Sequence, residues 1–211
     1  MLPDVLARMR MNGVGAAVCI GVNLEDLPRV IALAEGHDNL FATVGVHPEY
    51  TDTAEPTEDM LCELARHPKI IAIGETGLDY YWQKDAPEWQ RERFRTHIRA
   101  ARRSGLPLVI HTREAAADTL RVMKEEGADA VGGVMHCFTE TWEVASAALD
   151  LGFQRVSLFA RLAPQRLALW QEHDKAELAT LCIRADDTAD TGHRLIFAQH
   201  SGKRREVLRF P

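Results

Sequence analysis

Apolar runs alternate with amphipathic stretches along the first 150 or so residues of the chain. Five short runs are almost continuously apolar, at residues 16–22, 40–47, 70–75, 106–111 and 131–138. A stretch with apolar residues at helical spacing follows each of them. Strands that are buried on both faces and followed by amphipathic helices predict βα units and a parallel sheet.

Local signals support the helix boundaries in this pattern. Thr57 is a favourable cap for the helix that follows it. Pro87 and Glu88 begin a longer helical stretch, and Gly105 ends it. Repeated βα units suit either a doubly wound sheet or part of a (β/α)8 barrel. No glycine-rich phosphate loop follows any of the five strands.

The alternation weakens in the last quarter of the chain. Residues 153–160 and 193–199 are candidates for further strands, and residues 184–193 have the composition of a loop. We therefore expect an α/β barrel portion over residues 1–153 and a divergent segment over residues 154–211.

Four of the five strands end on a residue that can bind a metal ion. These residues are His47, Glu75, His111 and His136. Each alone is more often a loop residue that makes hydrogen bonds, but the carboxyl ends of parallel strands share one rim, where active sites form. Buried imidazoles and a carboxylate converging there are costly unless they share a cation.

Glu75 is central among these strands, so we interpret it as the catalytic residue and as a bridging metal ligand. Its neighbours Gly74 and Gly77 would let the backbone approach an ion or a substrate. Imidazole nitrogen and carboxylate oxygen suit zinc or manganese, and magnesium where oxygen dominates. A divalent ion lowers the pKa of bound water and polarises a phosphoryl or carbonyl oxygen, which predicts hydrolysis.

Composition and net charge restrict the kinds of partner and the cellular setting that the chain suits. The 211 residues carry a net charge of −6, which argues against a broad basic surface for nucleic acid but leaves a metal-bridged phosphate substrate possible. The four cysteines form no CxxC pair, which favours a reduced, cytoplasmic setting, and no apolar run reaches transmembrane length.

The aromatic run Tyr80–Trp82 suits either base stacking or internal packing. The arginine-rich stretch 91–103 is best interpreted as a solvated helix face.

Four motifs together resemble the TatD family of metal-dependent deoxyribonucleases. They are "GVHPE", "IGETGLDYYW", "LPLVIHTREA" and "MHCFT", in this order and at similar spacings. The resemblance covers roughly the first 153 residues. It implies a (β/α)8 barrel, two divalent ions and hydrolysis of phosphodiester bonds, with DNA as a substrate and 3′ exonuclease activity. It implies that Glu75, His111 and His136 are metal ligands, and that His47, Tyr80 and Arg113 lie on the substrate side.

The chain departs from the family pattern at both ends. Its first residues, "MLPDVLARMR", resemble the helix that follows the family's first strand, whose His-x-His pair is not found. The late metal-binding aspartate is not found either, because Asp186, Asp187 and Asp190 do not follow an apolar strand. We therefore expect an incomplete barrel, one weakly held Mg, Mn or Zn ion, impaired hydrolysis and self-association through an open barrel edge. The alternatives are an inactive remnant that binds metal, and an amidohydrolase acting on C–N or ester bonds.

Overall fold

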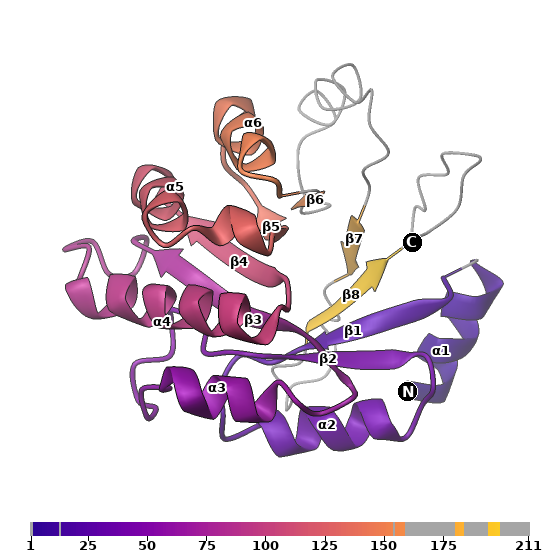
Figure 1. The fold of residues 1–211 in the computed structure, drawn as a ribbon. Helices are drawn as coiled ribbons and strands as arrows, with labels where there is room; N and C mark the ends of the chain where they lie inside the picture. The colour runs from indigo at the N-terminus through magenta and orange to yellow at the C-terminus, as the bar shows by residue number, and fades with distance from the viewer. Residues whose placement is uncertain (1, 13, 154, 159–179, 184–193, 199–211) are drawn as a thin grey trace.

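A computed structural model describes residues 2–12, 14–153, 155–158, 180–183 and 194–198 (Figure 1). The helices are α1 (Leu2–Met11), α2 (Leu27–Glu35), α3 (Glu58–Leu64), α4 (Glu88–Ser104), α5 (Ala116–Glu125), the 3-10 turn η1 (Ala128–Ala130) and α6 (Trp142–Asp150). The strands are β1 (Ala16–Ile20), β2 (Leu40–Val44), β3 (Ile70–Asp79), β4 (Leu108–Arg113), β5 (Gly133–Phe138), β6 (Arg155–Leu158), β7 (Thr180–Ile183) and β8 (Arg194–Ala198).

All eight described strands belong to one curled sheet with the order β6-β5-β4-β3-β2-β1-β8-β7. Strands β1 to β6 pair in chain order and are all parallel, whereas β8 pairs antiparallel with both β1 and β7. The strands at the two ends of the order, β6 and β7, lie close together, so the sheet curves back on itself (Figure 1). The predicted α/β, barrel-like fold is confirmed.

The described elements agree with most of the predicted ones. All five predicted strands are present, and the two further candidates appear as β6 and β8. Thr57 caps α3 as predicted, because its side-chain oxygen accepts a hydrogen bond from the backbone N–H of Met60 at 3.2 Å. Some strand boundaries were wrong: β2 ends at Val44, before His47, and β3 does not end at Glu75 but continues to Asp79, paired with β4. The aspartate-containing stretch 184–193 and residues 199–211 lie outside the described residues.

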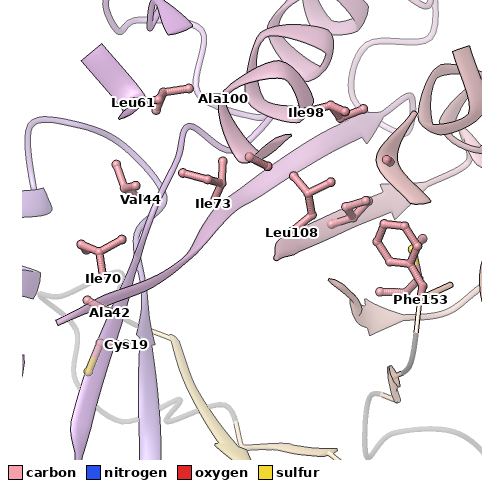
Figure 2. Packing of buried hydrophobic residues seen from close by; sticks show 14 of the residues in the cluster. Cys19, Ala42, Val44, Leu61, Ile70, Ile73, Ile98, Ala100, Leu108 and Phe153 are labelled. Atoms are coloured by element: carbon pink, nitrogen blue, oxygen red, sulfur yellow. The ribbon is translucent and has the colours of Figure 1, made fainter. Parts of the chain in front are cut away.

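The hydrophobic core lies between the outer face of the sheet and the helices. Leu61 of α3 and Ile98 of α4 pack there with Ile73 of β3 and Leu108 of β4, and all four side chains are fully buried (Figure 2). A smaller cluster, formed by Ile20, Ala72 and Val109, fills the inner face. The strands are therefore covered on both faces, as their continuously apolar sequences require.

Four arginines of α4 are paired with carboxylates along the outer side of the molecule. The pairs are Arg91–Glu88 at 2.6 Å, Arg95–Glu88 at 2.8 Å, Arg99–Glu126 at 2.8 Å and Arg103–Asp59 at 2.6 Å. This agrees with a solvated helix face for these four arginines, in which exposed ion pairs contribute little each. Arg93 and His97 of the same stretch differ from the prediction, because both are buried. None of the described helices is both long and apolar enough to cross a membrane.

Candidate metal centre

Three histidine rings approach one oxygen of a buried carboxylate. Glu75 Oε1 lies 2.8 Å from Nδ1 of His136, 3.5 Å from Nδ1 of His111 and 3.8 Å from Nε2 of His47. The Glu75 side chain is fully buried. Ligand atoms of His47, Glu75 and His111 all lie within 4.8 Å of one another, which is close enough to hold one metal ion. The structure therefore brings together all four residues that the strand ends suggested.

Adjacent strands deliver these four residues. Glu75, His111 and His136 lie in β3, β4 and β5, which are hydrogen-bonded neighbours, and His47 follows β2. Neighbouring strands are about 4.8 Å apart, so side chains from successive strands can reach a common point.

The loop that carries His47 is fixed by contacts on two sides. The backbone N–H of His47 donates to the carbonyl of Val22 at 2.9 Å, and its own carbonyl accepts from Arg93 at 3.2 Å. The preceding residue, Val46, donates its N–H to Nε2 of the buried His97 at 3.0 Å. Helix α4 therefore supplies several side chains that hold this loop in place, including Gln90, which donates to the Pro48 carbonyl at 3.2 Å.

Gly77 allows β3 and β4 to approach closely at the site. It pairs with His111, and a Cβ atom on Gly77 would lie 2.0 Å from the His111 carbonyl oxygen. Its φ of +133° is also a conformation that other residues rarely adopt. The structure thus gives this glycine a different role from the one expected, since its backbone approaches the neighbouring strand rather than an ion or substrate.

Asp79 orients the ring of His111. Its Oδ2 lies 3.0 Å from His111 Nε2, and its Oδ1 accepts the backbone N–H of Tyr81 at 2.9 Å. Burial raises the pKa of Asp79, but hydrogen bonding to His111 and to the backbone outweighs burial, and the net pKa is lowered. The ionised carboxylate accepts the proton on Nε2, so Nδ1 of His111 faces Glu75.

Asp79 was not predicted from the sequence, although a signal for it was present. Side chains on one face of a strand recur every second residue, so Glu75 and Asp79 share a face once β3 is extended. Because the strand was assumed to end at Glu75, the shared face of Glu75 and Asp79 was not recognised.

The donor set fits a divalent cation. Burial raises the pKa of Glu75, but the charges of His136 and His47 and hydrogen bonds from His111 and His136 lower it well below its usual range. Glu75 is therefore an anion at neutral pH. The buried Nδ1 of His111 lies 3.5 Å from Glu75 Oε1, which is longer than an ordinary hydrogen bond. When the ring is neutral, its lone pair points at the anionic oxygen 3.5 Å away, and a cation between the two would relieve the repulsion.

His47 and His136 present different atoms to the centre. Nδ1 of His47 accepts the backbone N–H of Glu49 at 3.2 Å, which leaves the proton of the neutral ring on Nε2, the atom nearest Glu75. This tautomer suits a hydrogen-bond donor, in line with the substrate-side role expected of His47. The ring of His136 lies between Glu75 and the thiol of Cys137, whose sulfur is 3.3 Å from Nε2.

The other two expected residues lie in different places. Arg113 stands at the rim, with its guanidinium 3.7 Å from the centre of the Tyr81 ring and 3.9 Å from a carboxylate oxygen of Glu49. Tyr80 points away toward α4 and α5: its hydroxyl donates to Asp118 at 2.8 Å and accepts from Arg91 at 3.1 Å. The structure does not bring Tyr80 together with the three histidines.

A cleft of about 250 Å³ adjoins the centre and is lined by Glu49, Asp79, Trp82, Gln83 and Gln90. Asp79 belongs to both, because its carboxylate contacts His111 and also forms part of the cleft wall. A ligand in this cleft would therefore lie next to the metal centre.

The sheet is curled and parallel over β1 to β6, and a buried carboxylate and histidines lie near the carboxyl ends of its strands. These features define an α/β protein with a barrel-like fold and a candidate metal site. Residues 2–160 match the family model described as TatD related DNase. The chain belongs to this family.

Individual relatives agree with this assignment. The metal-dependent hydrolase YabD of Bacillus subtilis, described as uncharacterized, is 40% identical over 155 residues, which are 72% of this chain and 60% of that protein. The "3'-5' ssDNA/RNA exonuclease TatD" of Citrobacter koseri is 33% identical over 71% of this chain and 58% of its own length. The crystal structure of YJJV, a TatD homolog from Escherichia coli, aligns with a TM-score of 0.69 at 26% identity, over 78% of this chain and 64% of that one. The chain thus spans about 60% or less of these two curated relatives.

Proposed function

We propose that this chain is a TatD-type hydrolase that uses a divalent metal ion to cleave phosphodiester bonds of DNA from the 3′ end. The observation that carries the proposal is the approach of three histidine rings to a single buried oxygen of Glu75. Family membership supports the reaction class. The name of the Citrobacter relative supports the substrate, because it specifies a 3′–5′ exonuclease on single-stranded DNA and RNA.

In this proposal Glu75 and His111 would hold the ion together with His136, the third ligand that the family resemblance implies, whereas the three ligand atoms that lie close enough to one another for one ion are those of His47, Glu75 and His111. When bound, it would supply a Lewis acid and lower the pKa of water. Glu75 provides the negative charge of the centre, and Asp79 keeps Nδ1 of His111 directed toward it. His47 offers its Nε2 proton to an oxygen of the substrate, and Arg113 at the rim offers a cation to a phosphate.

The cellular location of the chain and its self-association are also proposals. We infer a cytoplasmic setting because no disulfide is formed by the three cysteines with described side chains, Cys19, Cys62 and Cys137. Self-association through a sheet edge stays a prediction, and so does the division of the chain at residue 153. Size-exclusion chromatography would reveal the first by a concentration-dependent elution volume.

The test is digestion of a 5′-labelled single-stranded oligonucleotide with added manganese, zinc or magnesium. We expect a ladder of products shortened from the 3′ end, which a chelator abolishes, at a rate well below that of a full-length relative. Glu75→Gln keeps the shape of the side chain but removes its charge, so it should abolish cleavage and weaken metal binding measured by calorimetry. Arg102→Gln is the matched control, because Arg102 bonds to the Glu126 carbonyl on the outer surface, and it should change neither result.

The outcomes separate the alternatives. Metal binding that depends on Glu75 without any cleavage would favour an inactive remnant that binds metal. Hydrolysis of amide or ester substrates in place of DNA would favour an amidohydrolase. Metal affinity that is unchanged in Glu75→Gln would reject the site itself.

A further inference from the structure

Tyr81 and Trp82 expose two aromatic rings beside the cleft. The Tyr81 side chain is 37% exposed and that of Trp82 is 65% exposed. The two rings meet edge to face, with their centres 4.6 Å apart and their planes 87° apart. Single exposed apolar residues are ordinary, but two exposed aromatic rings that contact each other next to a candidate active site indicate a surface for a ligand.

Internal packing explains the neighbouring ring but not these two. Tyr80 is partly buried against the hydrophobic core and holds Asp118 through its hydroxyl. Tyr81 and Trp82 follow it at the end of β3 and face solvent instead. Their exposure is therefore not a consequence of filling the core.

Arg113 adds a flat cation to this surface. It ends the next strand, β4, and its guanidinium lies 3.7 Å from the centre of the Tyr81 ring and 5.9 Å from that of Trp82. We call these three side chains, Tyr81, Trp82 and Arg113, the aromatic platform. Two adjacent strand ends supply it, so its position relative to the metal centre is set by the sheet.

The cleft joins the platform to the centre. Trp82 and Asp79 both line it, and Asp79 contacts His111. The carboxylates of Glu49 and Asp79 make the cleft wall unfavourable for a phosphate. The side chain of Gln83 also lines the cleft and makes no hydrogen bond to a described residue, so its amide is available to a polar ring edge. The cleft therefore suits a flat, uncharged, heteroaromatic group of the ligand, while the phosphate of the same ligand lies at Arg113 and the metal centre.

We propose that the aromatic platform stacks an unpaired nucleobase of the strand whose phosphodiester lies at the metal centre. This subsite rests on the proposed function and deepens it, because it selects single strands: a duplex hides the faces of its bases. Stacking is tolerant of sequence, since every base has a π-face. The platform therefore favours unpaired strands of any sequence over duplexes and over strands without bases.

The experiment measures binding by fluorescence anisotropy, with calcium in place of a catalytic ion. The probes are a labelled oligothymidylate and a strand of equal length built from tetrahydrofuran abasic units. We expect the wild-type chain to bind the oligothymidylate roughly tenfold more tightly, the size of one base–aromatic stack. Trp82→Ala should remove this preference, and Trp82→Phe should keep most of it. Met60→Ala is the matched control, because it truncates an exposed apolar side chain on α3.

The outcomes distinguish this subsite from the proposed function. Equal binding of the two strands by the wild-type chain would overturn stacking, and metal-dependent cleavage of the abasic strand would at the same time uphold phosphodiester hydrolysis. If Trp82→Ala keeps both the preference for the oligothymidylate and the wild-type melting temperature, the proposed platform is also overturned. Binding of neither strand would overturn both proposals. A hairpin duplex that competes as well as the single strand would contradict the selection of unpaired bases.

Discussion

Asp79 Oδ2 accepts a hydrogen bond from His111 Nε2 at 3.0 Å, and this contact decides which ring nitrogen faces Glu75. The carboxylate is almost fully buried and is held by the backbone N–H of Tyr81, so its position is fixed before any ion arrives. A carboxylate behind a ligating histidine sets the tautomer and increases the basicity of the ring. We therefore expect Asp79 to act as a positioning residue for the candidate metal centre.

Asp79→Asn should weaken metal binding by about 10–100-fold. The amide can still accept the backbone N–H of Tyr81, but its NH₂ group can face Nε2 of His111 only if the proton moves to Nδ1. Nδ1 then has no lone pair for the ion. Calorimetric titration of manganese or zinc measures the loss. A melting temperature close to that of the wild-type chain would show that the effect is on the site, and unchanged affinity would refute the positioning role.

Metal affinity should rise with pH above the ordinary pKa of histidine. Burial lowers the pKa of His111, but hydrogen bonds to Asp79 and Glu75 outweigh it, and the net pKa is raised above 6.5. A proton on Nδ1 excludes the ion, so affinity increases as pH rises through this raised pKa. Titrations between about pH 6 and pH 8 would show the increase. In Asp79→Asn the midpoint should move to lower pH, because the carboxylate no longer stabilises the protonated ring. A pH-independent affinity would contradict this account.

Acid should destabilise the fold through His97. Burial lowers its pKa to about 4, below the ordinary histidine value of 6.5, and the neutral ring accepts the N–H of Val46 while hydrogen-bonded to the carbonyl of Arg93. The unfolded chain therefore binds more protons between these values, so stability is present above pH 6.5 and is lost as pH falls toward 4. The free energy of unfolding should fall by up to about 1.4 kcal/mol per pH unit in this window.

His97→Gln provides the control for this slope. Glutamine has both an acceptor and a donor but does not titrate, so urea unfolding at several pH values should give a flatter profile in the variant. The same slope in both chains would assign the acid sensitivity to other groups.

Gly77→Ala should destabilise the chain and disturb the site together. The added methyl group would meet the His111 carbonyl at 2.0 Å, and the φ of +133° is unfavourable for alanine. Backbone strain alone costs about 1–3 kcal/mol. Gly15→Ala is the matched control, because nothing lies within 4 Å of its added Cβ. Thermal melts of the two variants, followed by metal titration of each, would test the prediction. Equal melting temperatures would contradict the role given to the close approach of β3 and β4.

The alternation of apolar runs and helices was sufficient to predict β1 to β5 and their parallel pairing, because burial on both faces leaves a clear trace in sequence. The residues around Glu75 followed from their shared position at the strand ends. The extent of β3 did not, since Gly74 and Gly77 resemble the end of a strand although they permit close strand pairing. The antiparallel pairing of β8 with β1 was also not predicted, because the direction of pairing has no local signature.

The residues around Glu75 come from β2 to β5, whose order in the sheet equals their order in the chain. An ion held by Glu75 and two of the histidines would cross-link neighbouring strands at the ends where they would otherwise open most easily. Local opening of any one strand would separate the ligand atoms, so binding opposes every such opening by mass action. Metal occupancy and slow amide exchange across the strands that supply the ligands should therefore increase together as one cooperative unit, with β8 outside it.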